Sequence, residues 1–156
     1  MGLFLKEKEL LPLISQKRKG NKLVFTNGCF DLLHVGHIRY LKEAKSLGDI
    51  LVVGLNSDSS VKGLKGELRP VQNEQDRGEI LAAIECVDFV CLFDEATPLR
   101  LIQNINPDVL VKGGDWPIDK IVGADHVQKQ GGLVKTLQFV SGRSTSLIMQ
   151  KIVQLG

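Results

Sequence analysis

The sequence predicts an α/β fold in which a parallel sheet of five strands is covered by helices on both faces. Short apolar segments rich in Val, Leu and Ile alternate along the chain with segments of helical periodicity. Strands of a parallel sheet are buried on both faces, so they read as continuous apolar runs joined by helical crossovers. The five expected strands cover residues 22–27, 49–56, 87–93, 108–112 and 133–139.

Helices are expected between these strands and before the first of them. Apolar residues recur with helical spacing near the N-terminus, which predicts an amphipathic helix over residues 4–18. The polar segment from Ser57 to Pro70 contains two glycines and is expected to be mostly loop. Further helices are expected over residues 35–47, 73–85, 97–104, 124–129 and 144–155.

The composition predicts one globular domain over residues 1–156, with the N-terminal helix followed by a core of about residues 20–153. A net charge of +2 gives no indication of a nucleic-acid partner, and no apolar run approaches a membrane span. The first residues lack the uninterrupted apolar region of a signal peptide, and the three cysteines form no zinc pattern. We therefore expect a cytoplasmic protein that binds neither nucleic acid nor membrane.

The most informative stretch follows the first expected strand. Asn27 and Gly28 tolerate positive φ and therefore favour a turn at the end of that strand. A helix is then expected to begin near Val35. A strand, a glycine turn and a helix N-terminus together bind anions, because the first helical N–H groups have no intrahelical partners.

Two histidines stand at this expected helix N-terminus. His34 and His37 are three residues apart, so they share one face of a helix. Gly36 has no side chain, so a phosphate can approach its backbone closely. The pattern indicates phosphoryl chemistry, although histidines at this spacing also occur as half of a metal site or as partly buried side chains.

Polar or glycine-rich residues also follow the later strands of the predicted sheet. Ligands of parallel sheets bind outside the carboxyl ends of the strands, so these residues are expected to gather at one edge. Three hydroxyls open the last helix although a cap needs only one, so the others are available to a polyphosphate. The residues concerned are Lys112, Gly114, Asp115 and Trp116 after the fourth strand, and Arg143, Ser144, Thr145 and Ser146 after the fifth.

Basic residues after the second strand provide a further candidate site. Lys65 and Arg69 are a solvated charge run in the simplest interpretation, but they also offer cations to a second, phosphorylated substrate. Arg77 is either a surface charge or a phosphate ligand. Cys29 is either a nucleophile or a compact filler, and the filler is favoured because no activating constellation is present. A lone His126 is expected at the surface.

The pattern Gly28-x-Phe30-Asp31-x-x-His34-x-Gly36-His37 resembles the signature of the cytidylyltransferase-like nucleotidylyltransferases. The Ser-Thr-Ser run at residues 144–146 resembles the second signature of that family. This chain departs from the pattern just before that run, where it has Gly142 and Arg143 and the family is expected to have more variable residues. Within the family, FTNGCFDLLHVGHIRYL, NSDSSVKGLKGELRPV and LVKGGDW together resemble the adenylyltransferase domain of bacterial ADP-heptose synthases. Neither a Walker A motif nor a G-x-G-x-x-G motif after a strand is present, which argues against P-loop kinases and dinucleotide dehydrogenases.

The resemblance implies a Rossmann-like α/β/α sandwich that transfers AMP from ATP to D-glycero-β-D-manno-heptose 1-phosphate, for lipopolysaccharide core synthesis. It also implies a homodimer and Mg²⁺ held by the ATP phosphates rather than by the protein. On this interpretation the catalytic residues are His34, His37 and Lys65, and the sugar phosphate is bound by Lys65, Arg69 and Arg77. The nucleotide-binding residues are Thr26, Asn27, Gly28, Phe30, Asp31, Gly36, Lys112, Gly114, Asp115, Trp116, Arg143, Ser144, Thr145 and Ser146.

Two alternatives remain open at the level of sequence. The first is a related transferase that uses CTP and glycerol 3-phosphate, although such relatives more often have Met-Gly-Asp-Asp-Trp where this chain has the residues 112–116. The second is a nucleotide-binding module without catalysis, which the presence of both histidines and the Ser-Thr-Ser run disfavours.

Overall fold

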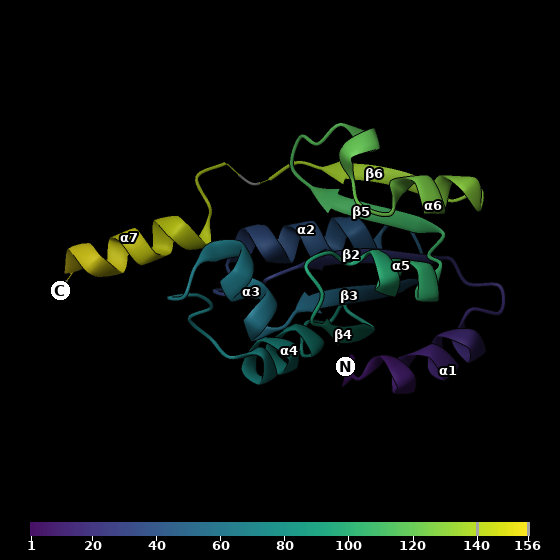
Figure 1. Ribbon diagram of the computed structural model, residues 1–156, viewed down its shortest axis with the longest axis horizontal. Helices are drawn as coiled ribbons and strands as arrows, with labels where there is room; N and C mark the ends of the chain where they lie inside the picture. The colour runs from purple at the N-terminus through teal and green to yellow at the C-terminus, as the bar shows by residue number, and fades with distance from the viewer. Residues whose placement is uncertain (140, 156) are drawn as a thin grey trace.

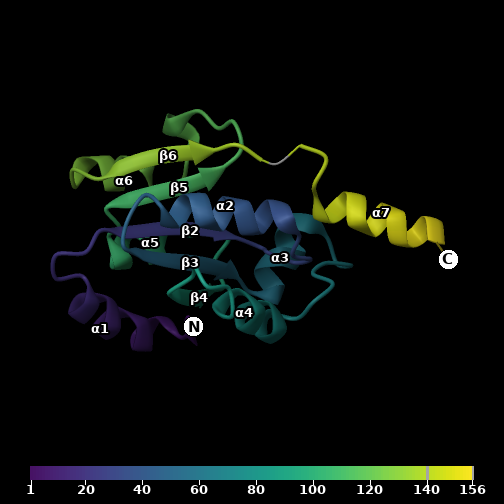
Figure 2. The same ribbon diagram turned by 180° about the vertical axis from the view of Figure 1, so that it is seen from behind.

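The structure, a computed structural model, describes residues 1–139 and 141–155 and has a central sheet with helices on both faces (Figures 1 and 2). All strand pairs are parallel, and the order across the sheet is β1-β4-β3-β2-β5-β6. The α/β/α prediction is therefore confirmed. The strands are β1 (Leu3–Leu5), β2 (Leu23–Gly28), β3 (Ile50–Asn56), β4 (Phe89–Phe93), β5 (Val109–Gly113) and β6 (Leu133–Leu137).

Two apolar clusters form the core, one on each face of the sheet. Successive side chains of a strand point to opposite faces, so Phe25 belongs to one cluster and Val24 to the other. Helices α1, α5 and α6 cover the first face, and α2 and α4 cover the second. The helices are α1 (Glu7–Lys17), α2 (Val35–Lys45), α3 (Asp58–Lys65), α4 (Glu74–Ala82), α5 (Leu99–Ile105), the 3₁₀ turn η1 (Ile118–Lys120), α6 (Ala124–Lys129) and α7 (Thr145–Leu155).

The strand order reverses beside β2. The chain passes from β2 to its neighbour β3 and on to β4, and then returns to place β5 on the other side of β2. At such a reversal the loops that leave the two adjacent strands diverge and leave room for a ligand at their carboxyl ends. The fold therefore positions a site where β2 and β5 end.

The prediction of five strands was wrong by one, because the N-terminal residues form an edge strand. Leu3–Leu5 pair in parallel with β4, and the expected N-terminal helix begins only at Glu7. Gly2 allows this pairing, since its backbone packs directly against the carbonyl oxygens of Ala82 and Val87, where a side chain would not fit. The five predicted strands correspond to β2–β6.

The segment from Ser57 to Pro70, which was expected to be mostly loop, begins with a helix. Ser57 is the N-cap of α3, and its Oγ accepts a hydrogen bond of 3.1 Å from the N–H of Ser60. The helix ends at Gly66, which has a φ of 94°. Only the residues after Gly66 form a loop, and they lie beside the carboxyl end of β2.

The last helix, α7, extends away from the rest of the domain (Figures 1 and 2). None of the residues from Thr145 to Leu155 is buried. Leu147, Ile152 and Val153 are among its exposed apolar side chains. Among residues 1–139 and 141–155, no helix has the length and apolar content that crossing a membrane requires.

Gly78 and Gly63 provide a matched test of how closely β1 is packed. A Cβ at Gly78 in α4 would lie 2.5 Å from the Phe4 ring of β1, whereas a Cβ at Gly63 in α3 would meet nothing within 4 Å. We expect Gly78→Ala to lower the free energy of unfolding by about 1–3 kcal/mol through overpacking. Gly63→Ala should raise it by about 0.5–1 kcal/mol through helix propensity. Urea denaturation measures both, and equal shifts in the two variants would contradict this packing.

Candidate active site

A cleft with a volume of about 720 Å³ opens at the carboxyl ends of β2 and β5. Its wall is formed by the loop between β2 and α2, by the end of α3 and the loop after it, by the end of β5, and by the segment that leads into α7. The cleft brings together most of the residues that the sequence predicts. These are Asn27, Gly28, Phe30, Asp31, His34, Gly36, His37, Lys65, Arg69, Lys112, Trp116, Arg143, Ser144, Thr145 and Ser146.

The two histidines are oriented by the backbone at the start of α2. Nδ1 of His34 accepts a hydrogen bond of 3.1 Å from the N–H of Gly36, and Nδ1 of His37 accepts one of 3.3 Å from the N–H of His34. An imidazole nitrogen that accepts a hydrogen bond carries no proton, so these contacts assign the proton of each neutral ring to Nε2. Both Nε2–H groups therefore remain as donors for a ligand.

Both imidazoles are neutral near pH 7. Burial lowers the pKa of His37 to about 4, and the charges of Lys65 and of His34 in its protonated form act in the same direction. Burial and the charge of Arg143 lower the pKa of His34. The rings stack with their centroids 4.0 Å apart, so two imidazolium charges would repel each other at this distance. The pair therefore offers hydrogen bonds without carrying positive charge.

The close packing around Gly36 explains why the residue between the histidines lacks a side chain. A Cβ at this position would lie 2.8 Å from Cε1 of His34 and 3.6 Å from Cβ of Arg143. A larger residue would displace the His34 ring and break its hydrogen bond to the backbone. Gly36 thus keeps both the helix N-terminus and the imidazole in reach of one ligand.

A second helix N-terminus, that of α7, lies beside the first. Ser144 caps it, since its Oγ accepts a hydrogen bond of 3.2 Å from the N–H of Leu147. Oγ1 of Thr145 donates to the carbonyl oxygen of Leu32 at 3.1 Å, which ties α7 to the loop before α2. The prediction that one of the three hydroxyls caps the helix is confirmed. Ser146 also lines the cleft.

Two exposed aromatic side chains flank the glycine turn after β5. A Cβ at Gly113 would lie 2.6 Å from the ring of Phe139, so the backbone passes directly beneath that ring. Gly114 has a φ of 97°, and a Cβ there would lie 3.4 Å from Nε1 of Trp116. Phe139 and Trp116 are 70% and 53% exposed, and their faces provide stacking surface for a planar base.

The opposite wall of the cleft is basic and is held in place by a buried carboxylate. Oδ2 of Asp31 accepts a hydrogen bond of 2.7 Å from Nε of Arg69, and Lys65 lies nearby in the same wall. Burial alone would raise the pKa of Asp31, but hydrogen bonds from Gln72, Val71 and Arg69 outweigh it and lower the pKa. Because protein donors occupy both carboxylate oxygens, the prediction that Asp31 contacts the nucleotide is corrected.

The structure also contradicts the prediction that Arg77 binds the sugar phosphate. Arg77 is 1% exposed and does not line the cleft. Its Nε and Nη1 donate to the backbone carbonyls of Gln72, Cys29 and Asn56 at 2.6–3.0 Å, and Nη2 donates to Oδ1 of Asp58 at 2.6 Å. Arg77 therefore stabilises the loops around the cleft through hydrogen bonds to their backbone.

Three predicted nucleotide ligands also lie outside the lining of the cleft. Thr26 is fully buried, and its Oγ1 lies 2.5 Å from the hydroxyl of Tyr40. Gly114 contributes a backbone turn, in which its N–H donates to the carbonyl of Leu137 at 2.8 Å. Asp115 is exposed and accepts a hydrogen bond from Gln138.

Four residues of the lining are not among the predicted site residues. They are Cys29, Tyr40, Gly113 and Phe139. A signal existed for Tyr40, because it lies three residues after His37 on the same helix face. Phe139 could have been suspected because it ends the fifth predicted strand, at the edge where ligands bind. Cys29 lies between two predicted ligands, but as a half-buried side chain it carries no distinct chemical signal.

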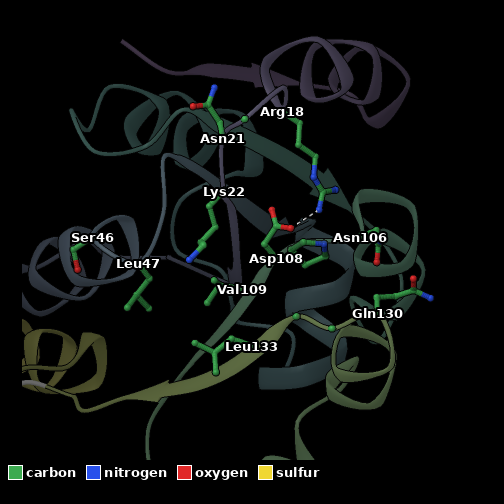
Figure 3. A pocket seen from close by; sticks show the side chains of 14 residues that line it. Arg18, Asn21, Lys22, Ser46, Leu47, Asn106, Asp108, Val109, Gln130 and Leu133 are labelled. Atoms are coloured by element: carbon green, nitrogen blue, oxygen red, sulfur yellow. Dashed lines mark hydrogen bonds and ion pairs between the residues drawn. The ribbon is translucent and has the colours of Figure 1, made fainter.

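A second opening of similar volume, about 730 Å³, lies at the opposite end of the sheet (Figure 3). It is bounded by the amino ends of β2, β5 and β6 and by the loops that precede them. Of its three charged residues, Arg18 and Asp108 are paired with each other at 2.9 Å, and Lys22 is the third (Figure 3). Helices end rather than begin around it, so it lacks the unpaired N–H groups that bind anions. The candidate active site is therefore the cleft at the carboxyl ends.

Comparison with known proteins identifies the family of the chain. The model of the cytidylyltransferase-like family matches residues 25–151, which include every residue that lines the cleft. The chain belongs to the cytidylyltransferase-like family. Of its family signatures, the His-x-Gly-His motif forms the N-terminus of α2, and the Ser-Thr-Ser run forms that of α7.

The chain is also similar to individual proteins that are longer than itself. The chain is 60% identical over 135 residues to the bifunctional protein HldE of Citrifermentans bemidjiense and 54% identical over 142 residues to that of Geobacter sulfurreducens. These matches include 86% and 91% of this chain. The chain spans only 28% and 29% of the length of those relatives.

Solved structures confirm the nucleotidylyltransferase fold. A lipopolysaccharide core biosynthesis protein from Thermoplasma volcanium is 33% identical with a TM-score of 0.63, over 78% of this chain and 98% of that one. Pantoate–β-alanine ligase from Francisella tularensis shares the fold at 17% identity and a TM-score of 0.61, over 94% of this chain and 69% of that one.

The cleft of this family member offers few ligands to a metal ion. Within residues 1–139 and 141–155, no group of three or more His, Cys, Asp or Glu side chains is arranged to hold one. The buried carboxylate of the cleft, Asp31, is already engaged by Arg69, Val71 and Gln72. The donors of the cleft, chiefly N–H and cationic groups, suit phosphate oxygens instead.

The protonation of His37 can be measured directly. Its pKa of about 4 lies below the ordinary value of 6.5, so the folded state favours the neutral ring. The corresponding stabilisation is complete above pH 6.5 and is lost as the pH falls from 6.5 through 4. We expect ¹⁵N NMR titration to give a midpoint near pH 4 with the Nε2–H tautomer above it. A midpoint near 6.5, or an Nδ1–H tautomer, would contradict the assigned hydrogen bonds.

Proposed function

We propose that this chain transfers AMP from ATP to D-glycero-β-D-manno-heptose 1-phosphate, giving ADP-heptose and pyrophosphate. The observation that carries the proposal is the convergence of two helix N-termini, two Nε2–H donors and a basic wall on one cleft. Such a set of donors matches two phosphorylated substrates that must meet. The similarity to HldE proteins and to a lipopolysaccharide core biosynthesis protein supports a role in the synthesis of the lipopolysaccharide core.

The reaction requires alignment and charge stabilisation rather than activation of the nucleophile. An oxygen of the sugar phosphate attacks the α-phosphorus of ATP, and the bond from that phosphorus to the bridging oxygen of the leaving group breaks. Pyrophosphate departs with the electron pair of that bond. Because the acceptor phosphate is already anionic at pH 7, no general base is needed.

The histidines stabilise the charge that develops on the phosphoryl oxygens. The Nε2–H groups of His34 and His37 donate to the triphosphate, and the backbone N–H groups at Gly36 add the positive end of the α2 dipole. Arg143 and the hydroxyl groups of Ser144 and Ser146 hold the β- and γ-phosphates. Donors that are fixed before the substrate arrives need no reorganisation during the reaction.

The remaining residues divide between the two substrates. Asn27, Gly28 and Phe30 line the part of the cleft that receives the nucleotide, with Lys112 beside them. Trp116 and the newly found Phe139 provide the stacking surface for adenine.

Lys65 and Arg69 form the part of the cleft that receives the sugar phosphate. Lys65 lies close enough to His37 to lower the pKa of that ring, so its charge also acts near the reacting phosphorus. We propose that Mg²⁺ enters as the ATP complex and neutralises phosphate charge when bound.

The decisive experiment measures pyrophosphate release with Mg²⁺ for each pairing of a nucleoside triphosphate with a sugar or polyol phosphate. We expect turnover with ATP and D-glycero-β-D-manno-heptose 1-phosphate. Turnover with CTP and glycerol 3-phosphate would keep the mechanism and replace the substrates. Tight ATP binding without turnover for any pair would make the chain a binding module.

His37→Ala tests the catalytic assignment. Removal of one preorganised donor to the developing charge should lower kcat about 100-fold or more. His126→Ala provides a matched control, because His126 lies in α6 and bonds to Asn106 rather than to the cleft. A folded His37→Ala protein with unchanged kcat would overturn the assignment, with folding checked by circular dichroism.

We also propose that the protein is a cytoplasmic homodimer. The support for the dimer is α7, which has no buried residue and exposes Leu147, Ile152 and Val153. Ile152→Glu should convert the dimer to a monomer in sedimentation velocity, whereas Lys151→Glu on the same helix should not. A monomeric unmutated protein at micromolar concentration would contradict this proposal.

A further inference from the structure

Asp31 holds the loop after α3 against the loop after β2. Its side chain is 1% exposed, and its Oδ1 accepts hydrogen bonds from the N–H groups of Val71 at 2.9 Å and Gln72 at 3.0 Å. Its Oδ2 accepts the hydrogen bond of 2.7 Å from Nε of Arg69 and a longer one of 3.0 Å from Val71. One oxygen therefore anchors the backbone of the loop, and the other fixes a guanidinium.

This arrangement leaves a buried guanidinium nitrogen of Arg69 without an acceptor among the residues that the structure describes. An arginine commonly pairs two nitrogens with the two oxygens of a carboxylate, but here Oδ1 of Asp31 is turned toward the backbone. As a result, Nη2 of Arg69 is buried and has no hydrogen-bond partner within the described part of the chain. A buried donor without a partner is unfavourable, and an anion with several oxygens would satisfy it. Arg69 lines the cleft and its side chain is 14% exposed, so an anion in the cleft can reach the guanidinium, and a small rotation of that group would bring Nη2 to it.

The position of Arg69 identifies which phosphate it meets. Arg143 and the start of α7 stand beside His34 and Gly36, and the chain reaches them from β6, which is separated from β2 by β5. Lys65 and Arg69 come from α3 and the loop after it, which follow β3 on the other side of β2. If the triphosphate lies along the two helix N-termini, the anion at Arg69 belongs to the second substrate.

We infer that Asp31 is a positioning residue that aims the guanidinium of Arg69 at the phosphate of the acceptor, so that the cleft selects phosphomonoesters. The inference rests on the proposed function and adds the group that distinguishes a sugar phosphate from an unphosphorylated sugar. Asp31 itself contacts no substrate and acts only through Arg69 and the loop that carries it.

Asp31→Asn separates the two tasks of this carboxylate. The amide oxygen can still accept from Val71 and Gln72 in place of Oδ1, while the amide NH₂ group stands where Oδ2 met Arg69. The loop therefore stays anchored and the guanidinium loses its partner. We expect KM for heptose 1-phosphate to rise roughly tenfold to a hundredfold, because the phosphate loses a hydrogen bond to a charged group that is no longer held in position. KM for ATP should stay unchanged.

Arg69 variants test whether Asp31 acts through the guanidinium. Arg69→Ala should show the same rise in KM for the acceptor, and added guanidinium ion should partly restore it. The double variant should be no worse than Arg69→Ala alone, because Asp31 has nothing left to position. Lys62→Ala is the matched control, since Lys62 is exposed one turn before Lys65 and does not line the cleft.

A binding measurement keeps this test independent of turnover. In protein saturated with α,β-methylene ATP, calorimetry follows the binding of inorganic phosphate, which should weaken in Asp31→Asn and Arg69→Ala but not in Lys62→Ala. If the unmutated enzyme turns over no substrate pair, the proposed function fails, yet this phosphate measurement still decides the role of Asp31. Unchanged phosphate binding in the variants, or a rise confined to KM for ATP, would overturn the inference.

Discussion

The cleft depends on how the first backbone N–H groups of α2 find partners. In most helices a serine, threonine or aspartate caps this end, but here the imidazole of His34 accepts from Gly36, and that of His37 accepts from the backbone of His34. Each cap uses Nδ1 and so fixes the ring, its tautomer and the direction of the remaining N–H group. Capping of the helix and the proposed recognition of phosphate thus use the two nitrogens of the same rings. Gly36 is required by both, because a side chain there would collide with the His34 ring.

The buried guanidinium of Arg77 holds together the segments that surround the cleft. Arg77 binds the carbonyl oxygens of Cys29 after β2, Asn56 at the end of β3 and Gln72 before α4, and it pairs with Asp58 of α3. These acceptors belong to the segments that diverge where the sheet ends, so Arg77 ties these segments together. The lone cation is stabilised by several partners, which is the condition under which a charge is tolerated in a protein interior.

The sequence predicted the sheet, its parallel sense and most of the cleft because those features have local signals. Apolar runs marked β2–β6, and glycines and histidines marked the turn before α2. It did not predict β1, because Leu3–Leu5 also fit a helical pattern and only pairing with β4 decides between them. Arg77 and Asp31 were misassigned for a similar reason. Whether a charged side chain meets solvent, substrate or a buried partner depends on residues distant in sequence, such as Asn56 for Arg77 and Arg69 for Asp31.

The isolation of α7 has a thermodynamic consequence for substrate affinity. The helix contributes hydroxyl groups to the cleft, yet no part of it is buried, so its contact through Thr145 and Leu32 does more to place it than the apolar core does. A polyphosphate that bonds to this helix end must also restrict the whole helix, and part of the intrinsic interaction energy is used for that ordering. We expect the affinity for the proposed nucleotide to be lowered accordingly, while the contacts themselves remain available to the transition state.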